Sequence, residues 1–120
     1  MATARYIVRD VEASVTFYKV LGFEVQQQFG PNMAIVRKDD LTLWLAGPTA
    51  SASRPMPDGR QPEPGGWNRF VVETDDIESL VARLKAAGVG FRNDIISGPG
   101  GRQTLAEDPS GNVVELFQPA

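Results

Sequence analysis

The sequence predicts an α+β fold built from two tandem copies of a βαβββ unit. An internal repeat is the first observation, because segments 10–25 and 76–91 align at an offset of 66 with five identical residues. The second is that apolar residues change from helical spacing to alternation after a glycine in each copy. The identities are Asp10 with Asp76, Glu12 with Glu78, Val15 with Val81, Lys19 with Lys85 and Gly22 with Gly88.

Each copy is expected to begin with a strand that leads into a helix. Segments 5–9 and 69–74 are short runs rich in β-branched and aromatic residues. Asp10 and Asp76 follow as N-caps, because an aspartate side chain accepts hydrogen bonds from the first free N–H groups of a helix.

The two expected helices each present one apolar stripe and end at a glycine. Gly22 and Gly88 stand where a helix commonly ends on a residue with positive φ. The stripes consist of Val11, Val15, Tyr18 and Leu21 in the first copy, and of Ile77, Leu80, Val81, Leu84 and Ala87 in the second.

Three strands are expected after each glycine. In the first copy they are 23–29, 33–37 and 41–46, and in the second 91–96, 103–106 and 112–117. The glycine-rich segment 98–102 lacks the lysine and following helix of a phosphate-binding loop, so it is interpreted as a turn.

The domain organisation follows from these elements. Residues 1–47 form the first module, 48–66 a linker rich in proline, glycine and serine, and 67–120 the second module. A connection of about 20 residues is unusually long, which favours a functional loop or lid.

Composition excludes several kinds of chemistry. The chain has no histidine and no cysteine, so transition-metal sites with imidazole or thiolate ligands and Ser-His-Asp triads are excluded. A net charge of -3 with scattered arginines argues against nucleic acid as a partner. No segment is typical of a membrane span or a secretion signal, so a cytoplasmic protein is expected.

Several segments resemble the vicinal oxygen chelate superfamily, which includes glyoxalase I, extradiol dioxygenases and the fosfomycin- and bleomycin-resistance proteins. The similarity covers the chain outside the linker. The segments that carry it are 8–14, Phe17-Tyr18 and 20–23 in the first copy, and 73–77, 84–89 and 108–117 in the second.

The resemblance implies that the two modules curl their mixed sheets around a central cleft, with the helices on the convex face. It also indicates where metal-dependent relatives hold their ligands, and the residues there are Thr3, Trp44, Arg69 and Glu115. Only Glu115 is of a ligand type, so neither a metal nor another cofactor is expected.

The expected cleft is apolar with a few charged groups. Arg69 and Glu115 are predicted to form an ion pair, which either binds a ligand or only stabilises the barrel floor. Trp44 and Trp67 are either stacking surfaces or ordinary packing, and Trp67 alternatively covers the end of the linker. The predicted ligand-binding residues are Arg5, Ile7, Phe29, Met33, Trp44, Trp67, Arg69, Val71, Glu115 and Phe117.

The leading functional hypothesis is a metal-free protein that sequesters an aromatic or hydrophobic small molecule such as an antibiotic. The resemblance to bleomycin-resistance proteins also implies a homodimer, with modules paired within one chain or exchanged between two. The alternatives are a metal-independent isomerase, epimerase or lyase, with Glu115 as base and Arg69 as anion stabiliser, and a regulatory or scaffolding module.

Overall fold

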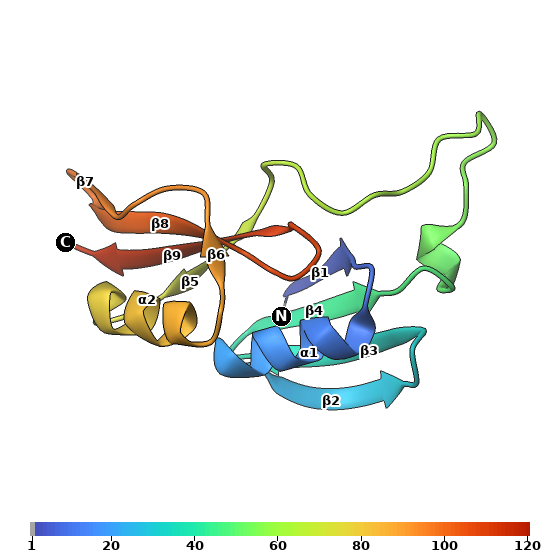
Figure 1. Cartoon of the computed structure of the whole chain (residues 1–120), viewed down its shortest axis with the longest axis horizontal. Coiled ribbons are helices and arrows are strands. Elements are labelled where there is room, and N and C mark those ends of the chain that lie inside the picture. Colours follow the sequence, from blue (N-terminus) through green and yellow to red (C-terminus); the bar gives the residue numbers. More distant parts are fainter. Residues whose placement is uncertain (1) are drawn as a thin grey trace.

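The computed structural model describes residues 2–120, so Met1 of the predicted first module lies outside the described residues. The first half forms β1 (Ala2–Ile7), α1 (Val11–Val20), β2 (Glu24–Phe29), β3 (Met33–Lys38) and β4 (Leu41–Ala46). The second half forms β5 (Phe70–Glu73), α2 (Ile77–Ala86), β6 (Gly90–Phe91), β7 (Ile96–Gly98), β8 (Gly101–Glu107) and β9 (Val113–Pro119). The predicted α+β class is confirmed. The first module contains β1–β4 and α1, and the second contains β5–β9 and α2 (Figure 1).

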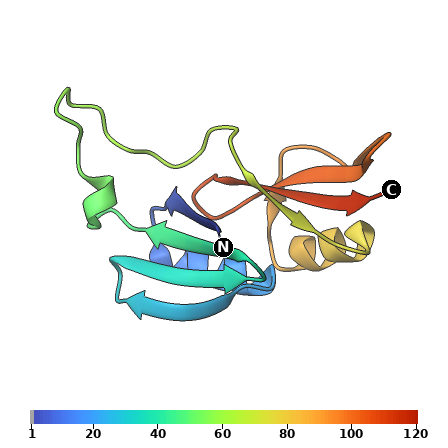
Figure 2. The ribbon, with the colours of Figure 1, turned by 180° about the vertical axis from the view of Figure 1, so that it is seen from behind.

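The two sheets share one topology. The first has the order β1-β4-β3-β2 and the second β5-β9-β8-β6, with β7 also paired to β8. In both, the first and last strands of the module are parallel and the other pairs antiparallel. The helices lie on one side of their sheets, and the sheets themselves are mixed (Figures 1 and 2).

Both helices begin and end as the sequence predicts. The Asp10 carboxylate accepts a hydrogen bond from the Ala13 N–H at 3.0 Å, and Asp76 accepts from Ser79 N–H at 3.1 Å. Gly22 and Gly88 have φ values of 105° and 86°. The predicted apolar stripes are buried, except that Ala87 is exposed at the C-cap of α2.

Several predicted strand limits are corrected by pairing. β1 starts at Ala2 and ends at Ile7 rather than spanning 5–9, because its whole length pairs with Leu41–Ala46. The predicted strand 69–74 is reduced to β5, while 33–37 and 103–106 extend to the bounds of β3 and β8. The predicted strand 112–117 is shifted to the bounds of β9, so that Asn112 precedes it. Predicted strand 23–29 begins one residue later, at Glu24.

The predicted strand 91–96 is wrong, because the ladder is interrupted between β6 and β7. Asn93 takes over hydrogen bonds that a regular strand makes through its backbone. Its Oδ1 accepts from the Leu105 N–H at 2.9 Å, and its main-chain oxygen accepts from the Thr104 hydroxyl at 3.0 Å. The side chain thus ends the strand by competing with the backbone for partners.

The modules share one hydrophobic core with an aromatic junction. Phe70 of β5 lies against Tyr6, Tyr18 and Phe23 of the first module, with ring centroids 5.2, 6.3 and 5.9 Å away. The Tyr6 hydroxyl also donates to the main-chain oxygen of Val113 at 2.8 Å. Apolar burial across this junction therefore ties the two copies into one unit.

The linker leaves β4, forms the short 3₁₀-helix η1 (Ser51–Ser53), and returns along one side of the molecule to β5 (Figures 1 and 2). The Ser53 hydroxyl donates to the main-chain oxygen of Gly47 at 2.7 Å, which fixes its first part. Residues 54–61 are exposed. Within residues 2–120, the helices are all too short or too polar to cross a membrane.

Candidate functional site

Strand alternation divides the side chains of each sheet between two faces. Leu43 and Leu45 of β4 are fully buried toward α1. Trp44 points to the opposite face and is half-buried. In the second module, Val72 is buried toward the core while Val71 is 49% exposed. The faces away from the helices therefore carry the predicted ligand-binding residues.

In the first module this face is centred on Arg5 and Trp44. The two residues are direct partners in the β1–β4 ladder, and the Arg5 guanidinium carbon lies 4.8 Å from the Trp44 ring centroid. Among the described residues, no carboxylate lies within ion-pair distance of Arg5. Arg5 thus combines a cation–π contact with N–H donors that have no carboxylate partner in the described part of the chain.

In the second module the predicted ion pair between Arg69 and Glu115 is present. Glu115 Oε1 accepts a hydrogen bond from Arg69 Nε at 3.0 Å, and Arg69 Nη2 lies 2.9 Å from the same oxygen as the ion pair. The side chains are 29% and 13% exposed, so solvent screens the pair only partly. The guanidinium also donates through Nη1 to the main-chain oxygen of Trp67 at 3.2 Å.

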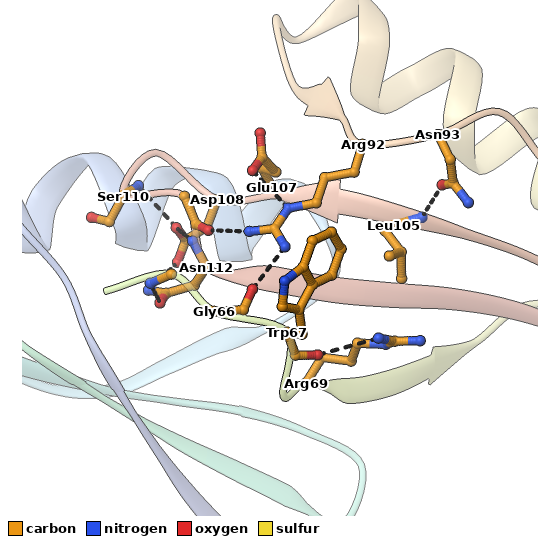
Figure 3. A network of polar contacts seen from close by, with 12 residues as sticks. Gly66, Trp67, Arg69, Arg92, Asn93, Leu105, Glu107, Asp108, Ser110 and Asn112 are labelled. Carbon is orange, nitrogen blue, oxygen red and sulfur yellow. Dashed lines mark hydrogen bonds and ion pairs between the residues drawn. The ribbon is translucent and has the colours of Figure 1, made fainter. Parts of the chain in front are cut away.

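Trp67 has a second arginine over its ring. The Arg92 guanidinium carbon lies 4.4 Å from the indole centroid, and the Trp67 residue is nevertheless 66% exposed. Figure 3 shows the indole between the side chains of Arg92 and Arg69. Each module therefore has an indole in contact with an arginine.

The other predicted residues divide between the two modules. Phe29 and Met33 face each other across the β2–β3 hairpin. Phe117 is paired with Glu73 in the other sheet. Val71 borders a hollow of about 320 Å³ between β5 and the β3–β4 turn. Ile7, beside Ala46, is half-buried.

A buried polar network around Asp108 joins the two modules. The Tyr18 hydroxyl donates to Asp108 Oδ2 at 2.9 Å, and Asp108 Oδ1 accepts from the N–H groups of Ser110 and Asn112 at 2.9 Å. Burial, and then the negative charge of Asp108, raise the pKa of Tyr18 far above its usual value. Burial likewise raises the pKa of Tyr6 to about 12. Both phenols therefore stay neutral at physiological pH.

The sequence as a whole matches a known family. The model of the Glyoxalase/Bleomycin resistance protein/Dioxygenase superfamily matches residues 1–116. The chain belongs to this superfamily. No curated protein shows significant sequence similarity to it.

Solved structures of the glyoxalase/bleomycin resistance superfamily resemble this chain over its whole length. A superfamily member from Sphaerobacter thermophilus is 32% identical, with a TM-score of 0.76 over 98% of this chain and 95% of the other. TnmS3, an antibiotic binding protein from Streptomyces, is 28% identical, with a TM-score of 0.69 over 100% and 97%. A lactoylglutathione lyase from Agrobacterium tumefaciens, at 22% identity and a TM-score of 0.75 over 98% and 92%, shows the shared fold.

The side chains of this superfamily member do not fit a transition metal. Glu115 is the one residue of a ligand type at the four positions implied by the resemblance, and its Oε1 is bonded to Arg69. Within residues 2–120, no three side chains of histidine, cysteine, aspartate or glutamate are grouped so that they could hold a metal ion. The arginine places a fixed positive charge where a cation would have to bind.

Sequence reasoning missed Arg92, which was assigned only to a regular strand. Its guanidinium pairs with Glu107 Oε2 at 2.9 Å and donates to the main-chain oxygens of Gly66 and Gly111 at 2.7 and 3.0 Å. The available signal was the polar run Arg92-Asn93-Asp94 inside a predicted strand, because asparagine and aspartate are depleted in strands.

Proposed function

We propose that this chain is a metal-independent small-molecule-binding protein that sequesters a planar or hydrophobic compound, such as an antibiotic, without converting it. The observation that carries the proposal is the pair of arginine-contacted indoles, Trp44 with Arg5 and Trp67 with Arg92. Flat aromatic surfaces of this kind stack on planar ligands, and the neighbouring N–H groups of Arg5 supply polar contacts.

The similarity to TnmS3 supports the same class, because that neighbour is an antibiotic binding protein. The lack of fitting metal ligands removes the chemistry for which imidazole or thiolate groups are needed. The expected compound presents a planar or apolar surface.

A homodimer in the cytoplasm is part of the proposal. On the predicted ligand-facing side, Phe29 and Val71 are 46% and 49% exposed in the single chain. Large apolar side chains left open in this way favour a second copy as the covering surface, and symmetric dimers are the commonest oligomers. Light scattering coupled to size exclusion measures the mass, and a monomer at micromolar concentration contradicts this part.

The enzyme alternative assigns Glu115 as a base. Its Oε1 already accepts a hydrogen bond from Arg69 Nε and lies 2.9 Å from Nη2, so proton transfer at that atom requires the pair to separate. We therefore place the binding role first.

The test uses three compounds with one ring system and different charges: naphthalene-2-sulfonate, 2-naphthol and 2-naphthylmethylammonium. We expect saturable binding by calorimetry, weakened about tenfold by Trp44→Ala, since stacking on an indole contributes on the order of 1 kcal/mol. Met56→Ala is the matched control, because it removes a 44% exposed apolar side chain from the linker.

Chromatography after incubation must recover each compound unchanged. Conversion of any of them favours the enzyme alternative. An absence of binding to all three contradicts the proposal.

A further inference from the structure

The linker ends in a fixed segment. The Gly65 N–H donates to Asn112 Oδ1 at 2.8 Å, and the Gly66 main-chain oxygen accepts from Arg92 Nη1 at 2.7 Å. The following residue, Trp67, is held through its main-chain oxygen by a side chain of the second module, as described above. Gly65 and Gly66 are thus bonded directly to side chains of the second module, and Trp67 is bonded to Arg69, two residues further along the chain.

Arg92 uses three sides of its guanidinium at once. Nε pairs with Glu107, Nη1 with the main-chain oxygen of Gly66, and Nη2 with that of Gly111, all at 2.7–3.0 Å. Its central carbon lies 4.4 Å from the ring centroid of Trp67 (Figure 3). An arginine makes such a set of contacts because its donors are fixed in one plane, which a lysine ammonium does not reproduce.

These contacts hold an indole that the protein itself covers only in part. Trp67 is 66% exposed, which is more than any other large hydrophobic residue among residues 2–120. An aromatic ring with one side against a guanidinium and much of its surface open is already oriented for a ligand. Binding then costs less, because the side chain is immobilised beforehand.

We propose that Arg92 is a positioning residue that preorganises Trp67 as a stacking surface for planar aromatic compounds. The proposal for Arg92 rests on the proposed binding function, and it adds that the Trp67 surface selects planar aromatic ligands. Since the charge of Arg92 is balanced by Glu107, the surface recognises aromatic area rather than ligand charge. Arg5, which has no such carboxylate, is the group that distinguishes charge.

The first experiment measures the position of Trp67 without any ligand. In a Trp44→Phe protein, Trp67 is the one remaining tryptophan, so fluorescence anisotropy and acrylamide quenching report on it alone. Adding Arg92→Ala is expected to lower the anisotropy and raise the quenching constant. Arg102→Ala is the matched control, because it breaks the ion pair with Glu78 elsewhere on the second module. Unchanged Trp67 fluorescence in Arg92→Ala overturns the proposal.

The second experiment measures affinity for the three naphthalene compounds by calorimetry, with Trp44 retained. Arg92→Ala is expected to weaken all three by a similar factor of about two to ten, the cost of ordering one free side chain. Arg102→Ala leaves the affinities unchanged. A loss confined to the sulfonate, or no loss although Trp67 becomes mobile, overturns the proposal.

Two further results keep the test decisive. If Arg92→Ala does not fold, Arg92→Lys replaces it. We expect this variant to have a lower Trp67 anisotropy and a higher quenching constant than the wild-type arginine gives. Values equal to those with the wild-type arginine overturn the proposal. If the wild-type protein binds none of the three compounds, the proposed function and the ligand class fail. In that case the fluorescence experiment still decides whether Arg92 positions Trp67.

Discussion

The two modules are irregular at the same point and resolve the irregularity differently. At the offset of 66, Gln26 corresponds to Arg92 and Gln27 to Asn93. In the first module the β2–β3 register shifts between Val25 and Gln27, and pairing then continues to Phe29. In the second module the register ends at Phe91 and resumes at Ile96, with one backbone hydrogen bond from the Arg92 N–H to the Leu105 oxygen at 2.9 Å in between.

The difference shows how one supersecondary unit acquires a local role without losing its fold. A bulge keeps the first sheet continuous, because one extra residue leaves the ladder and the rest stays paired. In the second module, the Asn93 side chain bonds to the neighbouring strand, and the Arg92 guanidinium bonds to the end of the linker. The break therefore connects strand geometry to the placement of Trp67.

The two modules also differ on the sheet faces that point away from the helices. The ladder partners Arg5 and Trp44 correspond, by their place in the parallel pair, to Val71 and Glu115. In the first module Arg5 lies over an aromatic ring and has no carboxylate at ion-pair distance within residues 2–120; in the second, Arg69 neutralises Glu115. The aromatic surface of the first module, Trp44, thus lies beside the charged Arg5. That of the second, Trp67, lies beside Arg92, whose charge is balanced by Glu107.

The largest expected effect comes from breaking the junction that makes the modules one unit. Asn112 donates to the main-chain oxygen of Ile7 at 2.8 Å and to Asp108 at 3.0 Å, and accepts from Gly65 at 2.8 Å. Asn112→Ala leaves buried groups unpaired, so we expect a loss of about 2–4 kcal/mol in the free energy of unfolding.

Urea unfolding followed by circular dichroism measures this loss, with exposed Asn68→Ala as control. A single transition is expected, since one core spans both modules. Two separate transitions in the wild type would show that the modules are independent.

Alkaline pH is the next largest perturbation, and it acts on the two tyrosines by which the first module contacts the second. Their pKa values are raised in the folded protein, that of Tyr6 to about 12 against 10 in the unfolded chain. Above pH 10 the unfolded chain therefore binds fewer protons, and stability falls with rising pH.

The slope is about 1.4 kcal/mol per pH unit for each tyrosine that stays protonated, an upper limit for the partly exposed Tyr6 because solvent screens it. The contribution of these two tyrosines to stability is fully present below pH 10. Unfolding curves at pH 8, 10 and 11 measure the slope, and Tyr18→Phe must reduce it. A stability independent of pH up to 11 contradicts the burial of these phenols.

The smallest expected effect compares the two irregular sites directly. Asn93→Ala removes the acceptor of the buried Leu105 N–H, so a loss of about 1–2 kcal/mol is expected. The equivalent Gln27→Ala changes an exposed strand side chain and is expected to cost less than about 0.5 kcal/mol. Thermal or urea unfolding measures both losses. Equal losses would show that Asn93 at the interrupted strand contributes no more to stability than Gln27 at the bulge.

The sequence alone determined the tandem βαβββ fold, because its signals are local. Asp10 and Asp76 cap helices, Gly22 and Gly88 end them, and apolar alternation distinguishes Leu43 from Trp44. The ion pair of Arg69 with Glu115 was also predictable, since parity and alignment placed both on one face of adjacent strands. The ligand-binding roles of these residues remain predictions.

Only the tertiary structure decided which residues from distant segments meet. The contact of Arg92 with Trp67 joins the end of the linker to an interrupted strand, and no periodicity encodes it. The same holds for Tyr18 and Asp108, 90 positions apart, whose hydrogen bond depends on how the modules pack. Local patterns specify helices, strands and their faces, whereas side-chain hydrogen bonds that break a strand or join modules depend on the packing of the whole chain.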